Sequence, residues 1–152
     1  MRVISVPWHH PGAVALRAEM TAEMSARYAD RAVDPAVFGV EHDSVVWTGL
    51  VMGRDGHPTG HAALRTLGGA VELKRLFVTA SHRGRGVAAA LLDASHHMAR
   101  SLGHQRVVLQ TGDRQPEAVR CYERAGYHRI PIFPPYEQVR YSICMELALP
   151  PV

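Results

Sequence analysis

A glycine-bearing loop between an apolar strand and a long helix constrains this chain more than any other feature. Residues 71–78 have the composition of a strand, and beyond residues 79–82 the chain runs through Arg83-Gly84-Arg85-Gly86-Val87-Ala88 into a helix. Gly84 and Gly86 allow the backbone to approach a ligand closely, and the free N–H groups of a helix's first turn suit phosphate. The sequence lacks the Gly-Lys-Ser/Thr of a Walker loop and the three spaced glycines of a dinucleotide fingerprint. The loop therefore predicts a phosphate-binding turn, with an ordinary strand–helix loop as the alternative.

A second segment further along the chain completes a recognisable pattern. It reads Gln115-Pro116-Glu117-Ala118-Val119-Arg120-Cys121-Tyr122-Glu123-Arg124-Ala125-Gly126-Tyr127. Together the two segments resemble the GNAT superfamily of acyl-CoA-dependent N-acetyltransferases. That family's pattern is Gln/Arg-x-x-Gly-x-Gly/Ala, followed by Asn-x-x-Ala-x-x-x-Tyr-x-x-x-Gly-Phe/Tyr. The chain matches it at Arg83, Gly86, Ala88, Ala118, Tyr122, Gly126 and Tyr127. It departs at Gln115, which replaces the usual Asn with a longer amide.

Apolar periodicity outlines the other elements of the chain. We expect strands at residues 3–6, 44–52, 60–66, 71–78, 107–109 and 139–147, and helices at 13–28, 87–102 and 116–125. This mixed α/β order fits one layered domain spanning residues 1–152. The resemblance implies a GNAT-like central mixed sheet, mostly antiparallel, with helices on both faces.

The resemblance also implies where acetyl-CoA would bind. A strand edge offers free N–H and C=O groups to an extended amide chain, so the pantetheine arm would pair with the backbone of Leu76, Phe77 and Val78. A backbone N–H near Phe77 or Val78 would stabilise the oxyanion of the thioester. The pyrophosphate would lie against Arg83, Gly84, Arg85, Gly86, Val87, Ala88 and Ala89, with Gln115 and Tyr122 also near the cofactor.

Tyr122 is the expected general acid. Attack of an amine on a thioester expels a thiolate, and a phenol can supply a proton or a strong hydrogen bond to it. The alternative is a packing tyrosine on the helix face shared with Ala118 and Ala125. Cys121 is expected to be a small buried hydrophobe, because no Cys/His pairing is evident.

Glu72 is the expected general base. It lies eleven residues before Arg83, the register of the catalytic glutamate in the family's histone acetyltransferases. Alternation along a strand would place Glu72, Lys74 and Leu76 on one face, and the charges around Lys74 favour a wet cleft there. A salt-bridged strand end is one alternative, and a water chain acting as the base is another.

The acceptor pocket is expected along the first helix and the loop after it, which commonly enclose the substrate in this fold. Glu19, Glu23, Arg27 and Tyr28 are the candidates, and a carboxylate facing the cleft would favour a cationic amine. An exposed ion pair between Glu23 and Arg27, four residues apart, is the alternative.

Composition and charge exclude several other classes of protein. The 47% apolar content indicates a globular chain, and a net charge of +3 with dispersed arginines indicates no nucleic-acid module. We expect no membrane span, because no apolar run is long enough to cross a bilayer. We also expect no metal, because the histidines, including His57 and His61, are expected at the surface. Two cysteines and the lack of signal-peptide anatomy suggest a cytoplasmic protein.

Taken together, the sequence predicts an N-acetyltransferase that moves acetyl from acetyl-CoA to a primary amine of a small molecule or peptide, by direct attack in a ternary complex. The alternative is a non-catalytic GNAT-like module that binds acyl-CoA as a sensor. Similar folds commonly pair through the final strand, so a homodimer is also expected.

Overall fold

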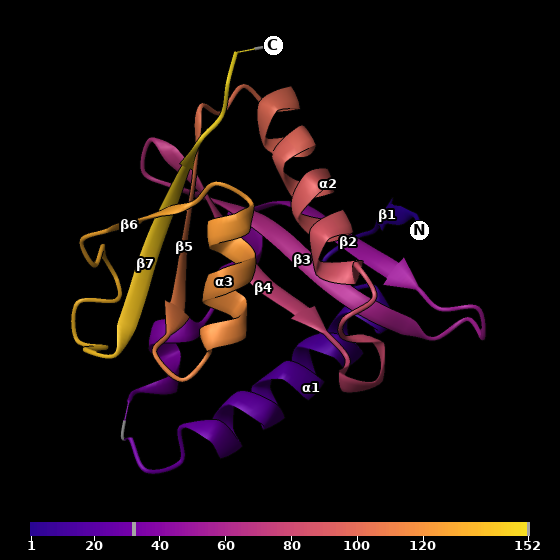
Figure 1. The fold of residues 1–152 in the computed structure, drawn as a ribbon, viewed down its shortest axis with the longest axis horizontal. Helices are drawn as coiled ribbons and strands as arrows, with labels where there is room; N and C mark the ends of the chain where they lie inside the picture. The colour runs from indigo at the N-terminus through magenta and orange to yellow at the C-terminus, as the bar shows by residue number, and fades with distance from the viewer. Residues whose placement is uncertain (32, 152) are drawn as a thin grey trace.

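The computed structural model describes residues 1–31 and 33–151 of the chain. Its sheet has the strand order β1-β2-β3-β4-β5-β7-β6 (Figure 1), and every neighbouring pair is antiparallel except β4 and β5. The strands are β1 Val3–Ser5, β2 Val45–Met52, β3 Pro58–Leu67, β4 Ala70–Val78, β5 Arg106–Gly112, β6 His128–Ile130 and β7 Ser142–Ala148. The helices are α1 Pro11–Arg27, α2 Val87–Ser101 and α3 Pro116–Arg124, with 3-10 turns η1 Pro35–Phe38, η2 His42–Ser44 and η3 Ala80–His82. The expected mixed, mostly antiparallel sheet is confirmed.

Local chemistry explains the helix boundaries. Pro11 and Pro116 open α1 and α3 at a position where the missing N–H costs nothing. The His10 ring caps α1 by accepting a hydrogen bond from the backbone N–H of Gly12 at 3.0 Å. The observed helices begin and end within two residues of the expected bounds, whereas β6 has too few residues to show a periodic pattern and was not expected.

The helices cover both faces of the sheet and bury separate apolar clusters. On one face α2 and α3 pack against strand residues such as Leu64, Leu73 and Leu109. On the other face Ala13 and Leu16 of α1 pack against Leu50 and Phe77. The candidate site lies at the ends of β4 and β5, between the helices of the two faces.

The parallel strands β4 and β5 diverge soon after they meet. They pair at Val71 with Val107 and at Glu72 with Val108, and no further pairing joins them along the described strands. We call the diverging parts, residues 73–78 and 109–112, the β4–β5 fork. Beyond the paired residues, β4 therefore presents backbone groups that β5 does not use.

A β-bulge at Arg75 interrupts β4. Arg75 has a positive φ of 57°, and the register between β3 and β4 shifts by one residue between His61 and Ala63. Phe77 therefore lies opposite His61 on the face that carries Glu72 and Lys74, and Leu76 turns to the α2 face. The expectation that Leu76 shares a face with Glu72 and Lys74 is wrong, because the extra residue reverses the alternation.

Candidate active site

The turn that opens α2 leaves backbone N–H groups available to a ligand. Gly86 precedes the helix with a φ of 84°, a conformation that glycine adopts without strain, and no side chain caps the helix. The first helical hydrogen bond runs from the Ala90 N–H to the Gly86 carbonyl, so the amides of residues 87–89 have no acceptor within α2. They lie at the positive end of the helix dipole, beside the exposed Arg85. This arrangement fits a pyrophosphate.

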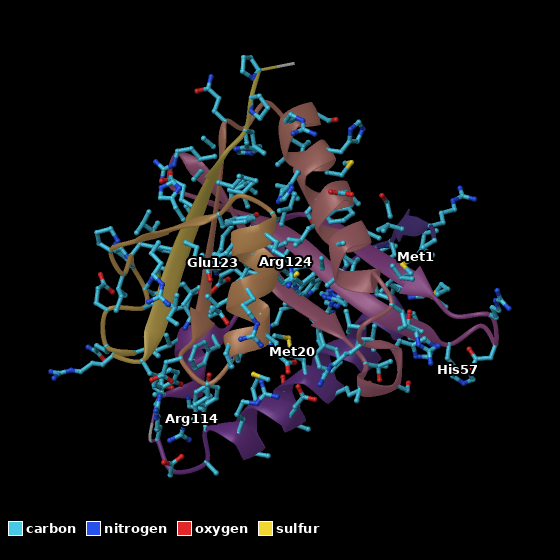
Figure 2. The ribbon with its side chains drawn as sticks, viewed as in Figure 1. Met1, Met20, His57, Arg114, Glu123 and Arg124 are labelled. Carbon is cyan, nitrogen blue, oxygen red and sulfur yellow. The ribbon has the colours of Figure 1, made fainter. Side chains whose placement is uncertain are left out.

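A cavity of about 730 Å³ adjoins the same turn. It lies between the β2–β3 hairpin, whose tip carries His57 (Figure 2), and the start of α2. Arg54, His82 and Arg85 line it together with apolar side chains such as Val87. Asp55 also lines it, so the surface around the turn is hollowed and carries two arginines against one carboxylate.

Arg83, by contrast, is bound within the protein. Its Nε donates to the Val78 carbonyl at 2.8 Å, and its Nη2 donates to both carboxylate oxygens of Glu23 at 2.8 and 3.0 Å. Glu23 also pairs with Arg27 at 3.3 Å. Arg83 thus ties the end of β4 to α1 and neutralises Glu23, and the Glu23–Arg27 ion pair that was the alternative to substrate binding is formed. Glu19 is likewise engaged, accepting from the Thr79 hydroxyl at 2.6 Å.

Tyr122 lies on the buried side of α3, with 7% of its surface exposed. It belongs to one apolar cluster with Val78 at the end of β4 and Val87 at the start of α2. Its ring meets the Tyr127 ring edge-on at 5.8 Å between centroids. Burial raises the pKa of the phenol well above its usual range, so Tyr122 is a protonated donor at neutral pH.

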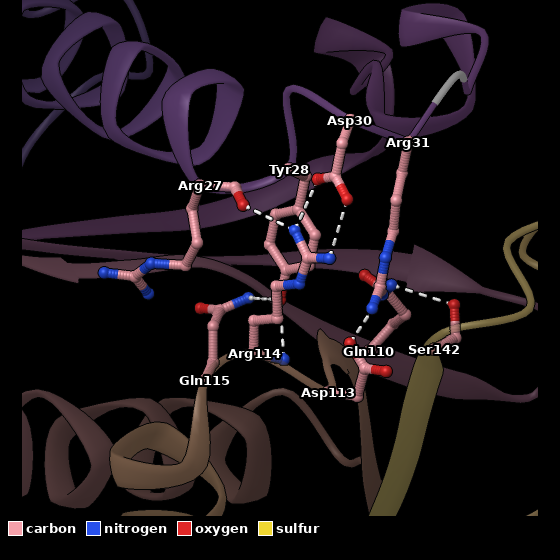
Figure 3. A network of polar contacts seen from close by, with 9 residues as sticks. All are labelled: Arg27, Tyr28, Asp30, Arg31, Gln110, Asp113, Arg114, Gln115 and Ser142. Atoms are coloured by element: carbon pink, nitrogen blue, oxygen red, sulfur yellow. Dashed lines mark hydrogen bonds and ion pairs between the residues drawn. The ribbon is translucent and has the colours of Figure 1, made fainter.

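Gln115 and Tyr28, both expected near ligands, contact each other (Figure 3). Gln115 Nε2 donates to the Tyr28 hydroxyl at 3.4 Å, and the Arg114 backbone N–H donates to the same oxygen at 3.1 Å. The Arg114 guanidinium lies at the end of α1 (Figure 2), where it pairs with Asp30 at 2.6 and 2.9 Å. Gln115 therefore joins α3 to the end of α1.

Glu72 is buried in a polar cluster. Its two carboxylate oxygens accept from Arg65 Nε and from the Tyr136 hydroxyl, each at 2.6 Å, and Lys74 Nζ donates to that hydroxyl at 2.8 Å. Glu72 is 0% exposed and Lys74 8%, so this strand face is not the expected wet cleft. Burial lowers the pKa of Lys74 to about 8. Charges this deep persist because they are paired and hydrogen-bonded. Arg65 comes from the position opposite Glu72 on β3, whereas Tyr136 lies 64 residues further along the chain.

Sequence reasoning missed a second polar cluster on the same face. His61 is fully buried, not at the surface as expected, and its Nδ1 donates to the Arg75 carbonyl at 2.8 Å. Its Nε2 accepts from Arg17 Nη1 at 3.0 Å. Burial lowers the pKa of His61 to about 4, which keeps the ring neutral, and the Arg75 carbonyl at Nδ1 with Arg17 at Nε2 selects this tautomer. Only the one-residue offset in strand pairing, invisible in the sequence, brings His61 to the bulge.

No group of three or more His, Cys, Asp or Glu side chains in residues 1–31 and 33–151 is arranged to hold a metal ion. In the same part of the chain, no helix has the length and apolarity needed to cross a membrane.

The model of the acetyltransferase (GNAT) family matches residues 13–127, most of the chain. The chain belongs to the GNAT acetyltransferase family. Members of this family use acetyl-CoA and act on amine acceptors.

Relatives and solved structures agree with this assignment. Rat N-acetyltransferase family 8 member 2 is 39% identical over 59 residues, 39% of this chain and 26% of that protein. The IAA acetyltransferase of Azospirillum brasilense is 33% identical over 90 residues, 59% of each protein. The chain thus aligns with about a quarter and three fifths of these relatives. A candidate acyl-CoA N-acyltransferase from Klebsiella pneumoniae has a TM-score of 0.82 with 25% identity over 97% of both chains.

Proposed function

We propose that this GNAT protein transfers an acetyl group from acetyl-CoA to a primary amine by direct attack in a ternary complex. The observation that carries the proposal is the common cluster of Val78, Val87 and Tyr122. This cluster covers one face of the sheet and contains residues of the α2 turn, of the unpaired end of β4 and of α3. One extended molecule lying along the fork would reach all three.

In this proposal the backbone stabilises the oxyanion and Tyr122 protonates the leaving group. The amine nitrogen attacks the thioester carbon, and a backbone N–H of Phe77 or Val78, beyond the bulge, donates to the oxygen that becomes negative. The carbon–sulfur bond then breaks, and Tyr122 gives its proton to the departing thiolate. The products are an N-acetyl amine and the free thiol, and the proton that the nitrogen loses as the amide forms restores the Tyr122 phenol through water. A phenol that stays protonated at neutral pH is suited to this step because it still carries the proton to be donated.

The proton of the attacking ammonium needs a separate path. Both oxygens of Glu72 are occupied by Arg65 and Tyr136, and no part of the Glu72 surface is exposed. We therefore propose that water removes the ammonium proton, and that Glu72 holds Lys74 and Tyr136 in place.

The test is calorimetric titration with acetyl-CoA, followed by a thiol-release assay over a panel of amines. The proposal expects saturable binding of acetyl-CoA and release of free thiol that depends on the amine. Binding with no thiol released by any amine would instead identify a sensor module, the alternative function.

A further inference from the structure

Two arginines without a carboxylate partner among the described residues lie about one helical turn apart along α1, because Arg17 belongs to α1 and Arg75 bonds Thr21, four residues further along it. Arg17 Nη2 donates to the Trp8 carbonyl at 2.5 Å, and its guanidinium lies 3.5 Å from the Trp8 ring centroid. Arg75 donates to the Thr21 hydroxyl at 3.1 Å and to the Phe38 carbonyl at 3.2 Å. Within the described residues, neither guanidinium forms an ion pair. Neutral groups therefore orient both cations and leave both charges uncompensated.

The two charges act on each other. Burial and the neighbouring Arg75 together lower the pKa of Arg17 to about 10, and burial lowers the pKa of Arg75. Holding two half-buried cations close together costs free energy, because each is partly desolvated and repelled by the other. An anion bound between them would recover that cost.

The surrounding charges reinforce this excess. Arg65 and Lys74 lie on the same face of the sheet as His61 and share a single carboxylate, that of Glu72. Glu23, the acid expected to attract a cationic amine, is already paired with Arg83 and Arg27. Of the two interpretations offered for Glu23, the ion pair is the one that forms. Even with Glu19, which accepts from the Thr79 hydroxyl, this side of the site carries more basic than acidic side chains.

Arg75 lies next to the backbone groups assigned to the acyl donor. Arg75 is the bulge residue, and the residues after it, Leu76 to Val78, carry the backbone groups assigned above to the acyl donor. Its side chain reaches α1 and η1, the elements expected to enclose the acceptor. Arg75 therefore links the strand end assigned to the acyl donor with the elements assigned to the acceptor.

From this geometry we propose that the acceptor is an amine that also carries a carboxylate, as an α-amino acid does, and that Arg17 and Arg75 bind the carboxylate. The proposal rests on the proposed acetyltransferase function. Planar guanidinium groups match a carboxylate with paired hydrogen bonds. Fixing the carboxylate would aim the adjacent amine at the acyl group beside the bulge.

The first experiment compares matched acceptors in the thiol-release assay. The panel contains the standard L-amino acids, their α-amides and the amines left by removal of the carboxyl group, with α-aminophosphonates as a second anionic class. We expect the best amino acid to exceed its amide and its decarboxylated amine in kcat/KM by on the order of 10- to 100-fold. Equal rates for acid, amide and amine would overturn the inference while leaving the acetyltransferase function intact. Aminophosphonates surpassing every amino acid would replace the carboxylate with a phosphonate-type anion and also overturn it.

The second experiment assigns the effect to the arginines. Arg17→Gln and Arg75→Gln should raise KM for the amino acid, leave the affinity for acetyl-CoA within about threefold, and reduce the rate ratio of acid to amide toward one. Arg129→Gln, an exposed arginine on β6, is the matched control and should change none of these. A purely structural role for the arginines would lower the rates of acid and amide equally, and an unchanged acid-to-amide ratio in both variants would refute the assignment.

A binding measurement covers the case in which no amine is acetylated. Calorimetric titration of the same amino acids in the presence of coenzyme A should show binding that Arg75→Gln removes. Amino-acid binding without turnover would refute the proposed transfer alone, whereas absence of both would refute the transfer and the carboxylate site.

Discussion

Gly112 and Tyr28 approach so closely that a side chain on Gly112 would overlap the Tyr28 hydroxyl. Gly112 ends β5 and Tyr28 follows α1, so this contact joins the open end of the fork, on its β5 side, to the helix that borders the acceptor side. The stacking of Tyr28 on Tyr141, at 4.7 Å between ring centroids, joins the start of β7 to the same contact.

This contact makes Gly112→Ala a sharp test of packing. We expect it to destabilise the protein by about 1–3 kcal/mol, because the added methyl group must displace a tyrosine held by hydrogen bonds and stacking. Chemical denaturation would measure the loss. Gly69→Ala, where a methyl group meets nothing within 4 Å, is the control. In a Tyr28→Ala background Gly112→Ala should cost much less; an undiminished cost would mean that Tyr28 is not the obstacle.

Tyr122→Phe removes the proposed proton donor while keeping the packed ring. We expect kcat to fall by about 100-fold or more, with the affinity for acetyl-CoA nearly unchanged, because protonation of the thiolate matters only in the transition state. Tyr127→Phe is the control: its hydroxyl bonds His96 at 2.8 Å, so this variant should lose stability and keep kcat. Unchanged turnover of Tyr122→Phe under chemistry-limited conditions would eliminate the general-acid role.

Gly86→Ala tests whether the turn that opens α2 binds coenzyme A. A methyl group at φ 84° costs about 1–2 kcal/mol in a left-handed conformation, and any shift of the turn moves the amides of residues 87–89 out of line with a pyrophosphate. We expect weaker binding of coenzyme A by calorimetry. Gly103→Ala carries the same strain at the other end of α2, with φ 85°, and should lose stability without losing affinity. Equal affinity in both variants would argue against the phosphate turn.

Glu72→Gln tests whether the buried carboxylate is structural. It leaves Arg65 and Lys74 without a counter-charge, so we expect a loss of about 3 kcal/mol or more in unfolding free energy. Glu146→Gln, which breaks the surface ion pair with Arg106, should cost less than about 1 kcal/mol. The pH profile of kcat for the folded Glu72→Gln enzyme should retain its acidic limb, since water accepts the proton; loss of that limb would restore Glu72 as the base.

His61 should make stability depend on pH. Its pKa is lowered from 6.5 to about 4 by burial, so between these values the unfolded chain binds a proton that the folded chain does not. Stability therefore falls as the pH drops through this window, by about 2 kcal/mol from pH 7 to pH 5. Denaturation at both pH values should show a smaller fall for His61→Gln. His57→Gln at the exposed hairpin tip should show the full fall, and the same fall in all three proteins would contradict the buried neutral ring.

The sequence by itself determined the features that depend on neighbours along the chain. The helices and most strands follow from apolar periodicity, and the α2 turn follows from the spacing of Arg83, Gly84 and Gly86, because a helix start and its free amides are set within a few residues. The tertiary structure decided the rest. One extra residue at Arg75 reversed the face of Leu76, and pairing across 60 residues or more joined Glu72 to Tyr136 and Arg83 to Glu23. The charge of the acceptor side depends on which acidic and basic side chains contact each other. Strand register and helix packing determine those contacts, and no local sequence pattern encodes them.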